Sequence, residues 1–444
     1  MFKYKKVKFS VKTGDGGVTV VSPEERLGWG KTIALGLQHI VAMFGATFLV
    51  PLLIGFPPAT TLFFTSISTA LFLLICAGKV PSYLGSSFAL IAPVTATVSS
   101  SGGQGSAIFG ILCTGLLLAL VGVIVHWAGV KWINILMPPV VCGSIVALIG
   151  FNLAPSAWSN FDKAPITAFI TLVFIIFFGA VFRRGKLAII SRLSILLGVI
   201  VGYIYAVSAG QVEFSKINDA KWFGLPEFSA PTVNFGVLLM FLPAVFVLIA
   251  ENIGHIKSIS TMTGKNLDKY SGRALLADGL GTVLAGLGGG SATTTYAENI
   301  GVMAATKVYS TAVYWVAAVG TMILALCPKF GIIISTVPAG VLGGAATLLY
   351  GMIGMLGVRI WMENKVNFAR MENITVAAVT LVIGIADFTF TIGDITVGGI
   401  AIGSLVCIAL FHILKVFYGF NKDFDKLGIT QGQESYEAYD TYGV

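Results

Sequence analysis

Residues 107–127 read Ala-Ile-Phe-Gly-Ile-Leu-Cys-Thr-Gly-Leu-Leu-Leu-Ala-Leu-Val-Gly-Val-Ile-Val-His-Trp, a run without an acidic, lysine or arginine side chain. A helix needs about 20 apolar residues to cross the hydrocarbon core of a bilayer, so this run predicts a helix that faces lipid. The whole chain has the same character, because only 11% of its 444 residues are charged, against about 25% in soluble domains. The composition therefore predicts an all-α polytopic membrane protein.

Fourteen apolar segments, bounded by charged residues, glycine or proline, follow one another along the chain. They are predicted at residues 33–55, 59–77, 81–97, 107–127, 133–153, 165–182, 189–209, 235–256, 271–287, 292–306, 311–327, 333–355, 372–390 and 394–418. With the N-terminus inside, the lysines and arginines that fall outside cytoplasmic segments are only Lys163, Lys216, Lys221 and Lys329. Because the positive-inside rule places basic residues in the cytoplasm, we predict fourteen transmembrane segments with both termini cytoplasmic.

Two of these segments are too polar and too interrupted to face lipid. Residues 81–89 read Pro-Ser-Tyr-Leu-Gly-Ser-Ser-Phe-Ala, and residues 286–299 read Gly-Leu-Gly-Gly-Gly-Ser-Ala-Thr-Thr-Thr-Tyr-Ala-Glu-Asn. Irregular backbone is tolerated at membrane depth only where protein or a cavity shields it. The segments are third and tenth, the same place in each half of a seven-plus-seven division. Paired broken segments of this kind indicate the central site of a transporter whose second half is inverted relative to the first.

Two glutamates, Glu251 and Glu298, lie in apolar surroundings, each within the pentapeptide Ala-Glu-Asn-Ile-Gly at 250–254 and 297–301. A carboxylate at membrane depth is costly, so by default it marks a substrate or proton pathway. The alternative is a structural carboxylate that a neighbouring helix satisfies. His255 lies four residues after Glu251 and on the same helical face, where the pair can hold and pass a proton. Glu298 is expected to open a half-helix whose N-terminal amides favour a carboxylate or a polar ligand.

Weaker candidates accompany the glutamates. Tyr296 and Phe88 lie on the two broken segments, where they supply backbone donors or a face for a planar ring, or take part in ordinary aromatic packing. Asp278 and Asp387 are further intramembrane carboxylates, which belong to a proton network or cap backbone groups. The residues alone indicate a small polar substrate whose donors suit two carboxylates.

Several classes of function are excluded at this stage. The five cysteines are scattered without metal or disulfide spacing, so they are predicted to be packed thiols, and neither a metal nor a cofactor is expected. No nucleophile constellation or phosphate loop indicates an enzyme. The formal charge of +8 sets membrane topology, so no nucleic-acid partner is predicted.

The stretch 298–307, Glu-Asn-Ile-Gly-Val-Met-Ala-Ala-Thr-Lys, resembles the signature of the nucleobase–ascorbate transporter family, also called nucleobase–cation symporters. The signature reads Glu/Gln-Asn-x-Gly-x-x-x-x-Thr-Lys/Arg/Gly. The resemblance extends to Gln38-His39, to the run Tyr-Leu-Gly-Ser-Ser-Phe at 83–88, and to Glu251 with His255, and so covers nearly the whole chain. Within the family, the sequence looks like the bacterial uracil permeases.

The resemblance implies a core domain and a gate domain built from inverted seven-helix repeats, with short antiparallel strands in segments 3 and 10. The core comprises residues 31–130 (segments 1–4) and 235–330 (segments 8–11), and the gate 131–210 (segments 5–7) and 331–418 (segments 12–14). Residues 1–30 and 419–444 are a cytoplasmic N-terminal segment and a cytoplasmic tail. The resemblance also implies the bacterial cell (inner) membrane and a homodimer through the gate, although no residue here indicates the dimer.

The implied function is import of uracil by proton symport. In such permeases the glutamates matching Glu251 and Glu298 contact the pyrimidine, and the histidine matching His255 supports proton coupling. Backbone groups near Phe88 and Ala297 complete the site. These permeases often have glycine where this chain has Ala297, which leaves the width of the pocket open.

Two alternatives stay open. Relatives in the same family carry purines such as xanthine or urate, and anion exchangers share a similar architecture. A glutamine at position 298 would pair its donor and acceptor with a purine edge, so Glu298 favours a pyrimidine. Two carboxylates at the site disfavour an anion.

Overall fold

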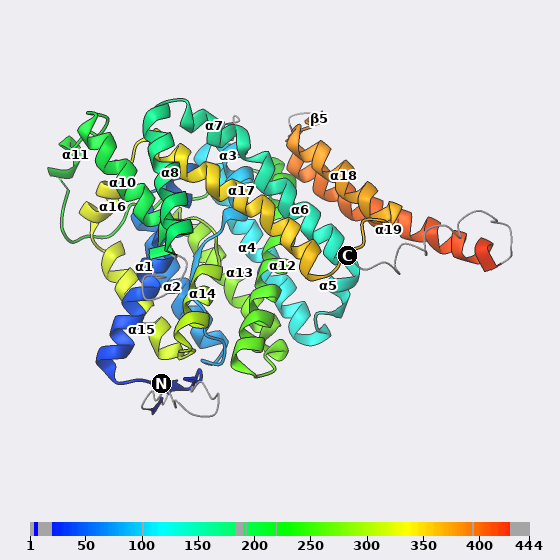
Figure 1. The fold of residues 1–444 in the computed structure, drawn as a ribbon, viewed down its shortest axis with the longest axis horizontal. Coiled ribbons are helices and arrows are strands. Elements are labelled where there is room, and N and C mark those ends of the chain that lie inside the picture. Colours follow the sequence, from blue (N-terminus) through cyan, green and yellow to red (C-terminus); the bar gives the residue numbers. More distant parts are fainter. Residues whose placement is uncertain are drawn as a thin grey trace.

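The computed structural model describes residues 4–7, 20–99, 102–182, 190–191, 193–218, 220–392 and 395–426. Over these residues the chain is a bundle of helices with three short two-stranded sheets. Figure 1 shows the N-terminus at one end of the bundle and the last helix projecting from its side. Outside the described residues lie 1–3 and 8–19 of the predicted N-terminal segment, residue 189, where a predicted span begins, and 427–444 of the predicted tail.

The helices follow the order of the predicted apolar segments. Those of the first half are α1 (Trp29–Ile54), α2 (Pro58–Ile75), α3 (Ile91–Ser99), α4 (Gly103–Ala128), α5 (Lys131–Leu136), α6 (Pro139–Asn152), α7 (Ala154–Phe161), α8 (Pro165–Val181) and α10 (Ser194–Ser208). Those that follow are α11 (Ser215–Asn218), α12 (Leu238–Thr263), α13 (Ser271–Gly288), α14 (Ala297–Thr306), α15 (Thr311–Ala325), α16 (Pro328–Ser335), α17 (Ala339–Glu363), α18 (Met371–Ile385) and α19 (Gly399–Lys426).

The remaining elements are short. The strands are β1 (Lys5–Lys6), β2 (Glu25–Arg26), β3 (Leu84–Ser86), β4 (Thr293–Thr295), β5 (Phe390–Ile392) and β6 (Ile395–Val397). Single 3-10 turns are η1 (Phe88–Leu90), η3 (Phe235–Val237) and η4 (Asp268–Tyr270).

The membrane-spanning character of the chain is clear from its helices. Among the described residues, seven helices are long and apolar enough to cross a membrane, or eight if α15 and α16, bent by 80°, form one span. Four shorter apolar helices accompany them. The prediction of a helical, multi-pass membrane protein is confirmed, while the count of fourteen spans stays a prediction.

Prolines explain where the predicted boundaries are wrong. The spans predicted from residues 133 and 333 begin later, because α6 and α17 start only after Pro138 and Pro338. Proline is favoured at the first turn of a helix, where its missing N–H costs nothing. The span predicted to end at residue 256 instead continues as a helix to Thr263, because Lys257 ends the apolar run but does not end the helix, which stops before Gly264.

The helices fall into two sets by their packing. In one set α13 packs against α4 and α2, and α15 packs against α2 and α1. In the other, α17 packs against α6, α7 and α8, and α18 packs against α6 and α19. Figure 1 shows α18 and α19 side by side at the edge of the bundle.

Glycine allows a close contact between α4 and α13. A Cβ at Gly122 would lie 2.3 Å from the backbone nitrogen of Leu276, and one at Gly279 would lie 2.3 Å from that of Ala119. Small residues let helix backbones approach in membranes, where close packing rather than water exclusion drives association. This contact fixes α13 beside the centre of the bundle.

Candidate functional site

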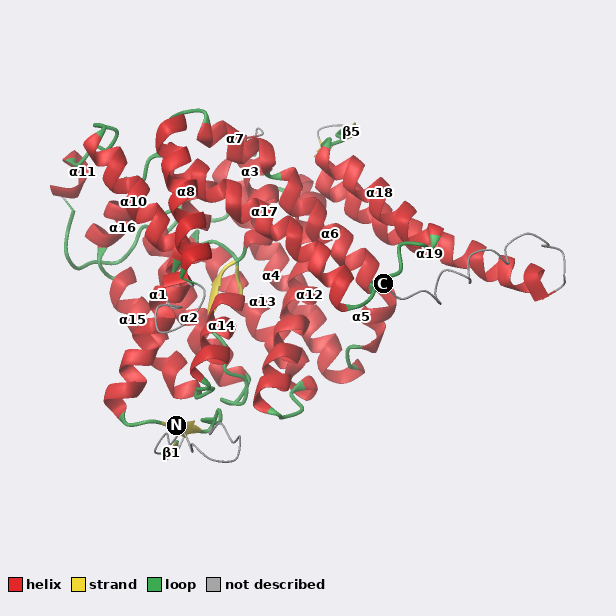
Figure 2. Ribbon diagram, in the orientation of Figure 1, coloured by secondary structure: helices red, strands yellow, loops and turns green. Residues whose placement is uncertain are grey.

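The centre of the site is an antiparallel strand pair. β3 and β4 pair in the register Leu84↔Thr295, Gly85↔Thr294 and Ser86↔Thr293. Figure 2 shows the pair in yellow near the middle of the bundle. β3 leads into η1 and α3, and β4 leads into α14, so the two helix N-termini meet at the pair and the helices leave it in opposite directions. β3 lies within residues 81–97 and β4 within residues 292–306.

The side chain of Tyr296 locks the strand pair. Its hydroxyl donates to the backbone oxygen of Ser86 at 2.8 Å and accepts from Oγ1 of Thr47 at 3.2 Å. Its ring covers Gly85, where a Cβ would come within 2.4 Å of the ring. The side chain of Tyr296 is buried in this packing, and its backbone nitrogen donates to the oxygen of Tyr83 at 3.1 Å, so a substrate-binding role for Tyr296 stays a prediction.

The two predicted glutamates come together beside the strands. Glu251 lies on α12 and Glu298 in the first turn of α14, and their carboxyl groups are close enough to interact electrostatically. The hydroxyl of Thr294 lies beside Glu251 but meets the geometry of a hydrogen bond with none of the described residues. Two neighbouring carboxyl groups at membrane depth favour a proton or a ligand with N–H donors at this place.

The glutamates face accessible space. Glu298 and Ala297 are exposed although they lie at the centre of the bundle, and Glu251 is half-buried. A Cβ at Gly254 or Gly301, the last residues of the two pentapeptides, would meet no atom within 4 Å. Open space therefore adjoins both pentapeptides.

His255 lies one turn after Glu251 on α12, as predicted. Its ring atom Nδ1 is 2.8 Å from Oγ1 of Thr295, so its hydrogen bond goes to β4. The described residues contain no hydrogen bond between His255 and Glu251. The histidine is thereby fixed against the strand that leads to Glu298, at a place where it can accept or pass a proton.

Phe88 occupies the start of η1, which contacts α12. Its half-buried ring packs against three separate apolar clusters, one of which contains Leu49, Ile175 and Leu342. The ring thus touches both sets of helices.

The two helix starts at the strand pair differ in how their amides are satisfied. At η1, Oγ of Ser87 accepts a hydrogen bond from the nitrogen of Ala89 at 3.2 Å. At α14 no side chain caps the first turn, which begins with Ala297 and Glu298. Uncapped amides at a helix N-terminus bind carbonyl or anionic oxygens. The arrangement can therefore donate hydrogen bonds from backbone and accept them at a carboxylate within one turn.

Two asparagines that the sequence analysis did not single out anchor the glutamates. Asn252 donates to Oδ2 of Asp278 on α13. Asn299 is bonded to His39 on α1, with Nδ2 at 2.9 Å from Nδ1 and 3.2 Å from the backbone oxygen. The signal was present, because both asparagines follow the glutamate in the repeated pentapeptide.

Other candidates take structural positions. Asp387 accepts from the nitrogen of Gly399 at 2.8 Å, so it caps backbone at the start of α19. The five cysteines are free thiols, and the described part of the chain contains no cluster of three or more residues that suits a metal.

The sequence matches known permeases. Residues 30–393 match a family described as the permease family. The putative pyrimidine permease RutG of Escherichia coli (strain K12) is 44% identical over 411 residues, covering 89% of this chain and 92% of that protein. The uracil permease of the same strain is 41% identical over 398 residues, covering 87% and 92%. The uracil permease of Paenibacillus larvae is 39% identical over 407 residues, covering 88% and 96%.

Solved structures of similar fold are transporters of other sequence families. The murine Slc26a9 anion transporter in its inward-facing state superposes with a TM-score of 0.67 and 13% identity, over 89% of this chain and 70% of that one. The transmembrane domain of the cyanobacterial bicarbonate transporter BicA gives a TM-score of 0.54 and 16% identity, over 86% and 97%. At these identities the likeness concerns the fold alone.

Proposed function

Because this chain belongs to the nucleobase–ascorbate transporter family of permeases, we propose that it imports uracil across the cell membrane together with a proton. The family predicted from residues 298–307 is confirmed, and its members are transporters rather than enzymes. The observation that carries the proposal is the meeting of Glu251 and Glu298 beside accessible space and an uncapped helix start.

The chemistry of uracil suits this arrangement. The base presents ring N–H donors beside carbonyl acceptors. Glu298 accepts from an N–H of the base, and the free amides of the first turn of α14 donate to a carbonyl. Ala297 offers its amide and only a methyl group, and the backbone near Phe88 closes the site from the opposing segment.

Proton coupling is assigned to Glu251 and His255. Glu251 lies inside a continuous helix, where the neighbouring backbone offers no free amide to hold a carboxylate, so in the neutral form it pairs more readily with a bound base. His255, bonded to Thr295, links this carboxyl to the strand that positions Glu298. A proton taken up from outside accompanies the base inward.

The packing supports a core and a gate. The pairs α4–α13 and α15–α2 correspond under a seven-plus-seven division, as do α10–α8 and α19–α18. Such matched pairs support the inverted repeat and fourteen segments. We propose that the set at 31–130 and 235–330 moves as a core against the gate at 131–210 and 331–418.

The orientation of the chain follows from charge. Lys79, Lys265 and Lys307 come together with the N-terminal segment at one end of the bundle. Gathered basic residues support a cytoplasmic location for this end and hence for both termini. The homodimer through the gate stays an implication of the family.

The alternatives are weighed on the same site. Purine import would use the same family fold, but Glu298 offers only acceptors to a base edge. Anion transport accords with the fold of Slc26a9 and BicA, yet Glu298 at the start of α14, with Glu251 near it, opposes an anion there.

The test is uptake of radiolabelled uracil into proteoliposomes, with and without an inward proton gradient. We expect saturable uptake that collapses with the gradient and is unaffected by excess xanthine. Competition by xanthine would indicate that the substrate is a purine. Absence of saturable uptake of either base would contradict the proposal.

A further inference from the structure

The segment from Val20 to Gly28, here called the N-terminal strap, crosses the end of the bundle before α1 begins. Val21 forms a parallel bridge with Val308, directly after α14. The nitrogen of Val21 donates to the oxygen of Lys307 at 3.1 Å, and the nitrogen of Tyr309 donates to the oxygen of Val21 at 2.8 Å. The strap is thus bonded to the link between α14 and α15.

The next residues extend this attachment to α2. The oxygen of Pro23 accepts from the nitrogen of Thr311 at 3.1 Å and from its Oγ1 at 2.9 Å. The same Oγ1 is 3.4 Å from the oxygen of Gly78, just beyond α2. Val21 and Leu27 are buried with Val308, so apolar contact accompanies the hydrogen bonds.

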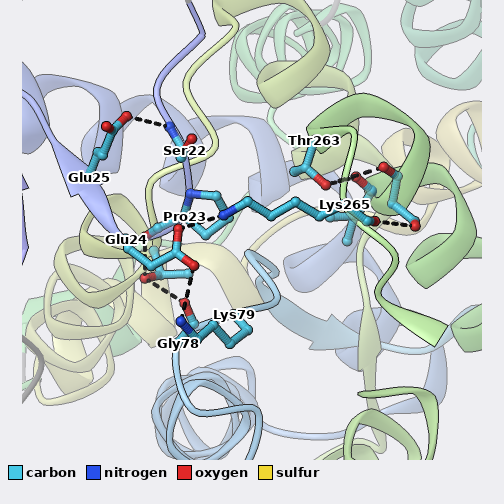
Figure 3. Close-up of polar contacts among 11 residues, drawn as sticks. Ser22, Pro23, Glu24, Glu25, Gly78, Lys79, Thr263 and Lys265 are labelled. Carbon is cyan, nitrogen blue, oxygen red and sulfur yellow. Dashed lines mark hydrogen bonds and ion pairs between the residues drawn. The ribbon is translucent and has the colours of Figure 1, made fainter. Parts of the chain in front are cut away.

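Glu24 completes the strap with two ion pairs, which Figure 3 shows in close-up. Its Oε1 is 3.1 Å from Nζ of Lys79, beyond the end of α2, and its Oε2 is 2.8 Å from Nζ of Lys265, beyond the end of α12. Burial raises the pKa of Glu24, but the hydrogen bonds from Lys265 and Lys79 outweigh it and lower the pKa to about 2. The carboxylate is therefore charged at neutral pH and holds both lysines at once.

We propose that Glu24 is a positioning residue for transport, because the strap fastens together the helices that carry Glu251 and Glu298. This role rests on the proposed function. Lys265 directly follows the helix of Glu251, and Lys307 directly follows the helix of Glu298. At 1.5 Å per residue, Glu298 lies about 12 Å from the strap end of α14 and Glu251 about 18 Å from that of α12.

The fastened helices all belong to the proposed core. α2, α12, α14 and α15 lie within residues 31–130 and 235–330, and the strap makes its described ion pairs and bridge with their ends alone. A strap attached to one moving body travels with that body. The strap therefore keeps the two carboxyl groups in register through the cycle and does not act as a gate that opens and closes.

The first experiment removes the charge of Glu24. We expect Glu24→Gln to raise the KM for uracil about threefold and to leave the maximal rate little altered. A threefold change in affinity corresponds to the free energy that exposed ion pairs contribute. High salt should raise the KM of the unaltered protein and leave that of the variant unchanged. The matched control is Glu25→Gln, because the described hydrogen bond of the Glu25 carboxylate stays within the strap, from the nitrogen of Ser22 at 3.0 Å. Equal KM values for the two variants would overturn the positioning role.

The second experiment locks the strap. Bridge-paired residues stand at the distance a disulfide requires, so Val21→Cys with Val308→Cys should cross-link on oxidation. We expect the oxidised protein to retain uptake, with each single variant as control for the five native thiols. If uptake stops on oxidation and returns on reduction, the strap must open during transport. That result would contradict the proposal that it only holds the helices together.

A third readout is independent of the substrate. Thermal unfolding of purified protein in detergent should show a lower Tm for Glu24→Gln than for Glu25→Gln, and the difference should vanish at high salt. This result would hold even if the unaltered protein failed to transport uracil, in which case only the proposed function would fail. Equal Tm values at low salt would mean that Glu24 does not fasten the helices.

Discussion

The pentapeptide Ala-Glu-Asn-Ile-Gly occurs twice at the centre of this molecule, once inside α12 and once at the start of α14. The two copies share a pattern of side-chain roles. The glutamate faces accessible space, the asparagine is buried against another helix, and the glycine borders an opening with no atom within 4 Å of its would-be Cβ. The same short sequence thus occurs on both helices, α12 and α14, that border the candidate site.

The copies differ in backbone context. Around Glu251 the helix is continuous, so the backbone amides are bonded to the preceding turn. Around Glu298 the helix is just beginning and no side chain of the N-cap residue caps its first turn, so these amides have no preceding helical turn to bond to. The same carboxyl group therefore has two uses. In the proposed mechanism, Glu298 beside the helix start recognises the base, and Glu251 inside the continuous helix gains and loses the proton.

The largest effect is expected at Glu298. Glu298→Gln places an amide donor against the N–H of uracil, so uracil affinity should fall roughly 10- to 100-fold, as expected for the loss of a charged hydrogen bond. Equilibrium binding of radiolabelled uracil to purified protein measures the change, with Glu25→Gln as a control away from the site. Unchanged binding would remove Glu298 from recognition.

The matched change at Glu251 should separate coupling from binding. Glu251→Gln resembles the protonated carboxyl group, so uracil binding should stay within about threefold of the unaltered protein, a change smaller than the loss of one hydrogen bond. Uptake should no longer respond to a proton gradient. Proteoliposome uptake with and without the gradient measures this. Full gradient-driven uptake in the variant would end the assignment of Glu251 to the proton, and equal loss of binding at both glutamates would break the comparison.

Much of the fold was predictable because lipid imposes strong constraints. The apolar runs, the two broken segments and the basic residues predicted a multi-pass helical protein and its irregular centre. The sequence analysis did not predict the helix starts after Pro138 and Pro338 or the extension of α12 to Thr263. Helix ends depend on the position of prolines and on packing between helices, and the average hydropathy of a segment describes neither.

The candidate site residues were predictable where a charged side chain lies at membrane depth, because placing it there costs free energy. Glu251 and Glu298 stand out because an intramembrane carboxylate is expensive. The partners of Asn252 and Asn299 were not predictable, since an asparagine in a helix has several uses and Asp278 and His39 are remote in sequence. The ring of Tyr296 likewise finds its place only once β3 and β4 pair.

The asparagines should differ in their effect on stability. Asn252→Ala removes the side chain that donates to the buried carboxyl group of Asp278. The free energy of unfolding should fall by about 1–3 kcal/mol. Asn299→Ala leaves His39 packed against the ring of Tyr314 at 4.6 Å, so the loss should be nearer 1 kcal/mol. Thermal unfolding of Asn252→Ala, Asp278→Ala and the double variant forms a double-mutant cycle. If the losses in stability of the two single variants simply add in the double variant, the bond between Asn252 and Asp278 does not anchor α12 to α13.

The smallest effects are expected at the glycines that end the two pentapeptides. Gly254→Ala and Gly301→Ala add a methyl group where no atom lies within 4 Å, so each should stabilise its helix by about 0.5–1 kcal/mol and leave uracil affinity unchanged. Gly279→Ala is the control, because its Cβ would lie 2.3 Å from the nitrogen of Ala119 and should lower the Tm. If one of the first two variants is stable yet loses uptake, the opening beside that glycine closes during transport, and the two copies then differ in motion as well as in chemistry.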